Sequence, residues 1–217
     1  MPKKSKNKGY FLSNLIYNLL VFINFFFKIF KKKFNIIHGL YDLIRNKAYL
    51  TCDINGKKIF FFIPNRLTEH RVNTFDKFET EGIKWISKFD EDSIFWDIGS
   101  NIGIYSIYAA LKHKNVQVIS FEPSTSNLRI LTRNISINNL ENKIKVNQFP
   151  LSNVENKHLI FYESKFMEGL GVHSFGEPKD FEGLKFNPAN KYSIFGTSIN
   201  YLIKNEILEI PNYIKID

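Results

Sequence analysis

The sequence has a single cysteine, Cys52, and it has no group of residues at the spacing of metal ligands. One thiol excludes an internal disulfide and a cysteine-based metal centre, and it fits a reducing compartment. A free cysteine within an apolar run is typical of a small strand residue with no chemical role. We therefore predict no metal site.

Acidic residues are missing from the N-terminal part of the chain. Residues 1–33 contain eight lysines and no Asp or Glu, in a chain whose formal net charge is +9. The chain totals of 30 basic and 21 acidic residues leave 22 and 21 for the remainder. A phosphate-binding face on that nearly neutral remainder is not supported, so we predict no nucleic-acid partner.

Charge of either sign is absent from residues 9–27, which are rich in Leu, Ile and Phe. On a helix, the polar residues of this part of the chain gather on one side, which predicts an amphipathic helix with lysines at both ends. Three interpretations stay open: a helix in the lipid headgroup region, a helix packed on protein, and a transmembrane span. Flanking lysines suit anionic lipid, whereas one-sided asparagines are costly in hydrocarbon. We expect a cytoplasmic protein, with membrane-surface contact through residues 10–33 as one alternative.

Two β-branched and aromatic runs in residues 48–63 meet at Asn55-Gly56, a dipeptide that favours a type I′ hairpin turn. The spacing of apolar residues over 67–89 then predicts one or two helices. These elements would form a lead-in, residues 34–91, between the basic N-terminal helix at 1–33 and a main domain at 92–217.

Strand and helix patterns alternate from residue 92 onward, which predicts an α/β fold with a parallel sheet covered by helices. We predict an added strand at 158–162 and a long loop over the sheet at 164–196, because that segment is rich in Gly, Phe and Asn with two prolines. The main strands are expected at 93–98, 116–121, 143–149 and 212–217, and the helices at 103–111 and 124–137.

The most informative stretch is Asp97-Ile-Gly-Ser-Asn-Ile-Gly103, which follows a buried strand and opens a helix. Glycine permits a tight turn and lets a ligand approach the backbone, and the helix N-terminus offers free N–H groups. A dinucleotide-binding turn would have G-x-G-x-x-G spacing, whereas here it is G-x-x-x-G. The Asp97 carboxylate would repel a pyrophosphate but would pair with an ammonium group, which argues for a cationic amino-acid cofactor.

The second strand ends in Phe121-Glu122-Pro123, and Glu122 lies 25 positions beyond Asp97. A carboxylate at this place accepts both hydroxyls of a ribose, because it offers two parallel acceptor oxygens. Together, the turn and the acid predict a nucleoside-containing cofactor.

These motifs resemble the FkbM family of methyltransferases over residues 90–217. The resemblance also includes residues 134–139 and Tyr213-Ile-Lys-Ile-Asp217. It implies a Rossmann-like class I fold that uses S-adenosylmethionine, with O-methylation of a sugar or related small metabolite as the expected activity and carbohydrate as the expected acceptor.

Carried over by position, the resemblance places Asp97, Gly99, Asn101 and Gly103 around the methionine part of the cofactor and Glu122 at the ribose. Ser100 stands where the family commonly has alanine. Pro150-Leu151-Ser152 matches a region near the adenine, but proline lacks a backbone donor, so we assign it no adenine contact.

The chain ends at Asp217, which matches the first acid of the family's Lys-Ile-Asp-Val-Glu-Gly segment. Because a class I sheet needs further strands, we expect the sheet to be incomplete at the C-terminus and the 217-residue chain to be truncated, and unstable or inactive alone.

Asp217 and Lys215 are the candidate catalytic residues, because they end a central strand near the acceptor side. His158 and His173 are weaker candidates for a base. Two other functions compete with methyl transfer: a nicotinamide-dependent oxidoreductase, and a non-catalytic membrane-associated scaffold with a degenerate fold.

Overall fold

The computed structural model describes residues 8–29, 35–54 and 56–217, which form two compact units, Met1–Ala48 and Tyr49–Asp217. Six of the eight lysines of residues 1–33, at positions 3–6 and 31–33, lie outside the described residues, as does the turn residue Asn55. We describe the two units separately as unit 1 and unit 2.

Unit 1 consists of two helices, α1 (Lys8–Ile29) and α2 (Ile36–Asn46). The side chain of Asn35 caps α2 by accepting hydrogen bonds from the backbone N–H groups of Ile37 and His38. By length and composition, residues Gly9–Ile29 of α1 are long and apolar enough to cross a membrane.

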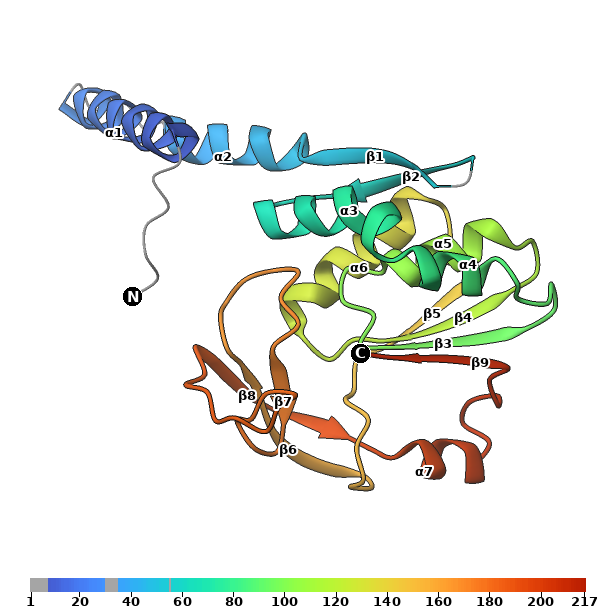
Figure 1. Ribbon diagram of the computed structural model, residues 1–217. Helices are drawn as coiled ribbons and strands as arrows, with labels where there is room; N and C mark the ends of the chain where they lie inside the picture. The colour runs from blue at the N-terminus through green and yellow to red at the C-terminus, as the bar shows by residue number, and fades with distance from the viewer. Residues whose placement is uncertain (1–7, 30–34, 55) are drawn as a thin grey trace. The chain divides into compact units, whose positions relative to one another are not determined.

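The centre of unit 2 is a four-stranded parallel sheet of β3 (Ile94–Ile98), β4 (Gln117–Phe121), β5 (Ile144–Asn147) and β9 (Tyr213–Ile216). The strands lie in the order β5-β4-β3-β9 (Figure 1). In order of these strands along the chain this is 3-2-1-4, the arrangement of the Rossmann-like sheet. The predicted fold class is therefore confirmed.

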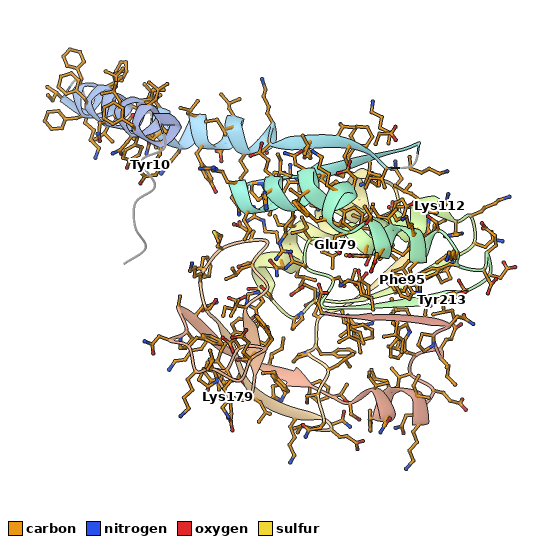
Figure 2. All side chains as sticks on the ribbon, viewed as in Figure 1. Tyr10, Glu79, Phe95, Lys112, Lys179 and Tyr213 are labelled. Atoms are coloured by element: carbon orange, nitrogen blue, oxygen red, sulfur yellow. The ribbon has the colours of Figure 1, made fainter. Side chains whose placement is uncertain are left out.

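Helices cover both faces of this sheet, as Figure 1 shows. On one side lie α5 (Ile104–Lys112), α6 (Thr125–Ile137) and α4 (Thr80–Ile86), whose Trp85 packs on Phe95 and Tyr213 of the sheet. On the same side α3 (Arg66–Phe78) packs on α5 through Phe75. On the other side, α7 (Ile199–Lys204) packs against Trp96 and Phe121. Because side chains alternate along a strand, Phe95 and Asp97 face the α5 side. Phe95 is paired in register with Tyr213, and Figure 2 shows the two labels side by side on the sheet.

The predicted hairpin is present as β1 (Tyr49–Ile54) and β2 (Lys57–Phe62), paired antiparallel with Ile54 opposite Lys57. Its second strand lies against α6 and α5. The residues of β2 that face these helices, among them Ile59 and Phe61, are buried. The hairpin therefore adds a layer over the helices rather than extending the main sheet.

A second, antiparallel sheet corrects the prediction of a structureless loop at 164–196. The added strand β6 (Lys157–Glu163) pairs with β7 (His173–Phe175) and with β8 (Asn190–Gly196), both of which lie within that segment. Both prolines and two of the five glycines of this segment lie between the two strands. These residues are typical of loops, so the sequence pattern did not predict β8, which pairs with β6 over seven positions.

Candidate functional site

The turn between β3 and α5 is held against the end of β4. The backbone N–H groups of Gly99 and Ser100 both donate to the carbonyl of Phe121, at 3.0 Å. The Ser100 hydroxyl donates to the carbonyl of Asp97 at 2.8 Å. These bonds fix the turn at the carboxyl edge of the sheet, where ligands of such sheets bind.

The two glycines of the turn are required for different reasons. Both have positive φ angles, 78° at Gly99 and 86° at Gly103. A Cβ on Gly99 would lie 3.3 Å from the Cβ of Asp217, and one on Gly103 would overlap the side chain of Leu131. Gly99 therefore keeps the backbone close to the end of β9, and Gly103 lets α5 begin against α6.

Glu122 is buried, with 3% of its surface exposed, at the end of β4. One carboxylate oxygen accepts from the backbone N–H of Asn101 at 2.7 Å and the other from that of Ser124 at 2.8 Å. Burial raises the pKa of Glu122 to about 8, and the two N–H donors oppose that shift. Each oxygen keeps an acceptor position for a ligand.

Asp97 is fully buried on the α5 side of the sheet, where Ser106 donates to its Oδ2 at 2.6 Å. Parallel register puts Lys215 beside it, and the Lys215 ammonium lies 3.6 Å from Asp97 Oδ1 and 2.9 Å from Asp217 Oδ2. Burial raises the pKa of Asp97, and the charge of Lys215 acts in the opposite direction. This ion pair joins the two strands at the site.

Three cavities adjoin this edge of the sheet. One, of about 500 Å³, is lined by Ile98, Leu151 and Ile216 among others. The other two share lining residues with each other and form the candidate site. The larger of these two, of about 270 Å³, is lined by Gly99, Asn101, Glu122 and Asp217, with apolar walls from Phe121, Phe149, Leu151, Phe161 and Phe175. The smaller, of about 140 Å³, lies on the α3 side and is lined by Lys215, Tyr105, Phe75 and Glu79 among others. The two cavities share Arg71, Asn101 and Asp217. A ligand in one is therefore within reach of a ligand in the other.

The structure brings together most of the residues that the sequence suggested. Gly99, Asn101, Glu122 and Asp217 line the larger cavity and Lys215 the smaller. Asp97 and Gly103 lie behind these walls, Asp97 in contact with Lys215 and Gly103 at the start of α5.

Residues 168–171, which belong to the segment predicted as a loop over the sheet, lie at the larger cavity. The carbonyl of Leu170 accepts from the side-chain amides of Asn101 at 3.0 Å and Asn127 at 2.9 Å. Asn127 also accepts from the N–H of Gly169, and Arg71 Nε donates to the carbonyl of Gly169 at 2.6 Å. Asn127 carried a weak sequence signal, a polar residue in the first turn after Glu122-Pro123. Arg71 carried none.

The two candidate histidines differ in position. His173 lines the larger cavity, where its Nε2 lies 2.8 Å from the carbonyl of Leu170. Burial lowers its pKa, so the neutral ring is favoured near pH 7. His158 is exposed on β6 and packs on Phe195, away from both cavities.

Comparison with known proteins shows similarity to methyltransferases, although no protein-family profile matches the chain. A stretch of 67 residues is 30% identical to Methyltransferase sdnD of Sordaria araneosa, and covers 31% of this chain and 26% of that protein. The chain thus spans about a quarter of the length of this curated relative. Similarity to a methyltransferase is shown, whereas the resemblance to the FkbM family is not confirmed.

Two solved structures illustrate the matches at the level of structure. One is a SAM-dependent methyltransferase from Agrobacterium tumefaciens, with 13% identity and a TM-score of 0.34 over 46% of this chain and 32% of that one. The other is the complex of aTrm5 with tRNALeu, with 18% identity and a TM-score of 0.34 over 51% of this chain and 30% of that one.

The prediction of a carbohydrate acceptor without a nucleic-acid partner is corrected by these matches, because the aTrm5 structure contains a tRNA. The charge argument behind the prediction used the total charge of residues 34–217. A total does not report how charge is distributed over a surface, so it could not exclude a polyanionic partner.

Proposed function

We propose that this chain binds S-adenosylmethionine in the larger cavity and serves as a methyltransferase. The observation that carries the proposal is the pairing of a glycine turn with a buried acid. Gly99 and Glu122 end adjacent parallel strands and line one cavity. Similarity to Methyltransferase sdnD supports the same activity.

Glu122 is the residue proposed to hold the ribose. Its two oxygens are already oriented by the N–H groups of Asn101 and Ser124, so the ionised carboxylate needs no rearrangement to accept two hydroxyls. Because the pKa of Glu122 is raised to about 8, we expect ribose binding near pH 7 to be coupled to release of its proton. Preorganisation of this kind lowers the entropic cost of binding. The residues present therefore fit a nucleoside.

The remaining lining residues fit the two ends of the cofactor. Phe149, Leu151 and Phe175 provide an apolar surface for an adenine ring. At the other end, Arg71 offers a guanidinium for the methionine carboxylate, because it lines the junction of the two cavities.

S-adenosylmethionine, when bound, supplies a methyl group on a positively charged sulfonium. Asp217 is exposed at the junction of the cavities and is the residue proposed to receive the proton of an acceptor hydroxyl, which makes the reaction O-methylation. Lys215 is a positioning residue in this proposal: it holds Asp217 at 2.9 Å while neutralising the buried Asp97.

The test is calorimetric titration of S-adenosylmethionine and S-adenosylhomocysteine into the full chain and into a Glu122→Ala variant. We expect saturable binding by the wild type and a loss of affinity of about tenfold or more in the variant, because two charge-assisted hydrogen bonds to the ribose are removed. Glu141→Ala, which removes an exposed acid outside both cavities, is the matched control and should bind like the wild type.

Two outcomes would reject the proposal. Saturable binding of NAD in place of S-adenosylmethionine would favour the oxidoreductase. No binding of either ligand by a chain whose circular dichroism shows an intact fold would favour the scaffold.

A further inference from the structure

The two helices of unit 1 form a hairpin that leaves most of α1 uncovered. Asn24 connects them: its Oδ1 accepts from the backbone N–H of Ile36 at 2.9 Å and its Nδ2 donates to Asn35 Oδ1 at 2.7 Å. The half-buried residues Leu20, Ile23, Asn24 and Phe27 mark the side of α1 that faces α2. None of the described residues from Gly9 to Ile29 is buried.

A different side of α1 carries large apolar residues that are exposed. They recur at helical spacing and between 56% and 74% of each is accessible: Phe11, Leu12, Leu15, Leu19, Phe22 and Ile29. We call this set the apolar stripe. An apolar surface of this extent is rare on soluble proteins unless it binds something.

The remaining side of α1 is mainly polar, although the exposed apolar residues Val21 and Phe25 interrupt it. Asn14, Tyr17 and Asn18 are exposed there, and Lys28 lies in the last turn on the same side. Asn18 stands near the middle of the helix, so a bilayer-spanning orientation would put its amide in hydrocarbon, at a substantial cost. An orientation parallel to a surface keeps this side in water.

The charge of the chain is concentrated in the same unit. Residues 1–48 contain ten Lys and Arg residues and one acidic residue, Asp42. The chain totals are 30 and 21, so residues 49–217 have 20 of each and no net charge. A purely electrostatic partner such as RNA would use the lysines but would have no need of the apolar stripe. An anionic bilayer uses both.

We propose that α1 lies in the surface of an anionic lipid bilayer, with the apolar stripe in the acyl region and the polar side toward water. The occupant of the stripe is the bilayer itself. This inference rests on unit 1 alone and does not depend on the proposed activity of unit 2.

Vesicle flotation of the full chain tests the proposal. We expect binding to vesicles that contain phosphatidylglycerol and weaker binding to pure phosphatidylcholine. The Leu15→Asn/Phe22→Asn double variant should lose binding by tenfold or more, because two large apolar side chains no longer enter the acyl region. Asn14→Gln/Asn18→Gln, on the polar side of the same helix, is the matched control and should bind like the wild type.

Orientation is measured with an environment-sensitive fluorophore on single cysteines in a Cys52→Ser background. Tyr17→Cys and Leu19→Cys lie two residues apart on nearly opposite sides of α1. A helix in the surface puts the label at 19 in hydrocarbon and the label at 17 in water, whereas a span puts both at a similar depth.

Several results would overturn the proposal. Equal labelling depth at 17 and 19 would establish a span. Unchanged flotation of a helical Leu15→Asn/Phe22→Asn variant would show that the stripe is not inserted. Failure to float, together with binding to a single-stranded RNA probe or with self-association in the ultracentrifuge, would assign unit 1 to RNA or to a second copy of the chain.

Discussion

At the scale of single residues, Glu122 makes stability depend on pH. Its pKa is about 8 in the folded protein and near the ordinary value of 4.5 when unfolded. Between these values the folded state holds a proton that the unfolded state has released, so stability falls as pH rises, by up to about 1.4 kcal/mol per pH unit. We expect this fall between pH 5 and pH 8 in urea unfolding of the wild type, and a shallower fall in Glu122→Gln.

The comparison uses the slope with pH rather than the absolute stability, because the amide introduced by Glu122→Gln also changes the hydrogen bonds from Asn101 and Ser124. Asp97 is buried with a raised pKa and contributes a slope of the same sign in both proteins. Glu141→Gln, at an exposed site, should keep the wild-type slope. Identical slopes in the wild type and Glu122→Gln would show that Glu122 ionises normally in the fold.

Some residues of the candidate site could be predicted from the sequence and others could not. Gly99 and Glu122 were predictable because each adjoins a strand that precedes it directly, so local sequence fixes their place at the sheet edge. Arg71 and Asn127 were not, because the loop that they hold, at Gly169 and Leu170, lies 98 and 43 positions further along the chain. Such contacts depend on tertiary packing, which local patterns do not encode.

At the scale of elements, Asn134 in α6 and Asn138 at its C-terminal cap join the β1–β2 hairpin to the helices. Asn134 Oδ1 accepts from the N–H of Phe62 at 2.7 Å and its Nδ2 donates to the carbonyl of Ile102 at 2.9 Å. One turn later, Asn138 bonds both the N–H and the carbonyl of Phe60. The asparagines thus satisfy backbone groups of β2 and of the glycine turn, as buried polar groups require.

We predict that Asn134→Ala destabilises the protein by about 2–4 kcal/mol, because it leaves the buried N–H of Phe62 and the carbonyl of Ile102 without partners. The measurement is urea unfolding at pH 7. Ser136→Ala, at an exposed position of the same helix, is the control and should change stability by less than about 0.5 kcal/mol. A loss below about 1 kcal/mol in Asn134→Ala would mean that water replaces both bonds.

Elements differed in how well the sequence predicted them. The strands β3 and β4 were found because strands buried on both faces appear as continuous apolar runs. The run of β9 looked alike in the sequence, but alternate residues of this edge strand are exposed. β7 and β8 were missed because β7 has three residues and β8 follows a segment with two glycines and two prolines. Their pairing with β6 comes from tertiary contact, which overrides weak local preference.

At the scale of the whole molecule, the net charge and the apolar stripe belong to unit 1, whereas the buried core and both cavities of the candidate site belong to unit 2. This division separates the two proposals, because a membrane contact uses residues before 49 and cofactor binding uses residues after it. Each is therefore expected to survive the loss of the other.

A chain that starts at Tyr49 tests this independence. We expect it to unfold within about 3 °C of the full chain, because the buried core of the described residues lies in unit 2. It should bind S-adenosylmethionine with the affinity of the full chain, and it should no longer float with anionic vesicles. Calorimetry and flotation on the same preparation provide both measurements. If a folded 49–217 chain still floats with anionic vesicles, the lipid contact lies on unit 2. If the 49–217 chain melts far below the full chain, the two helices of unit 1 stabilise unit 2.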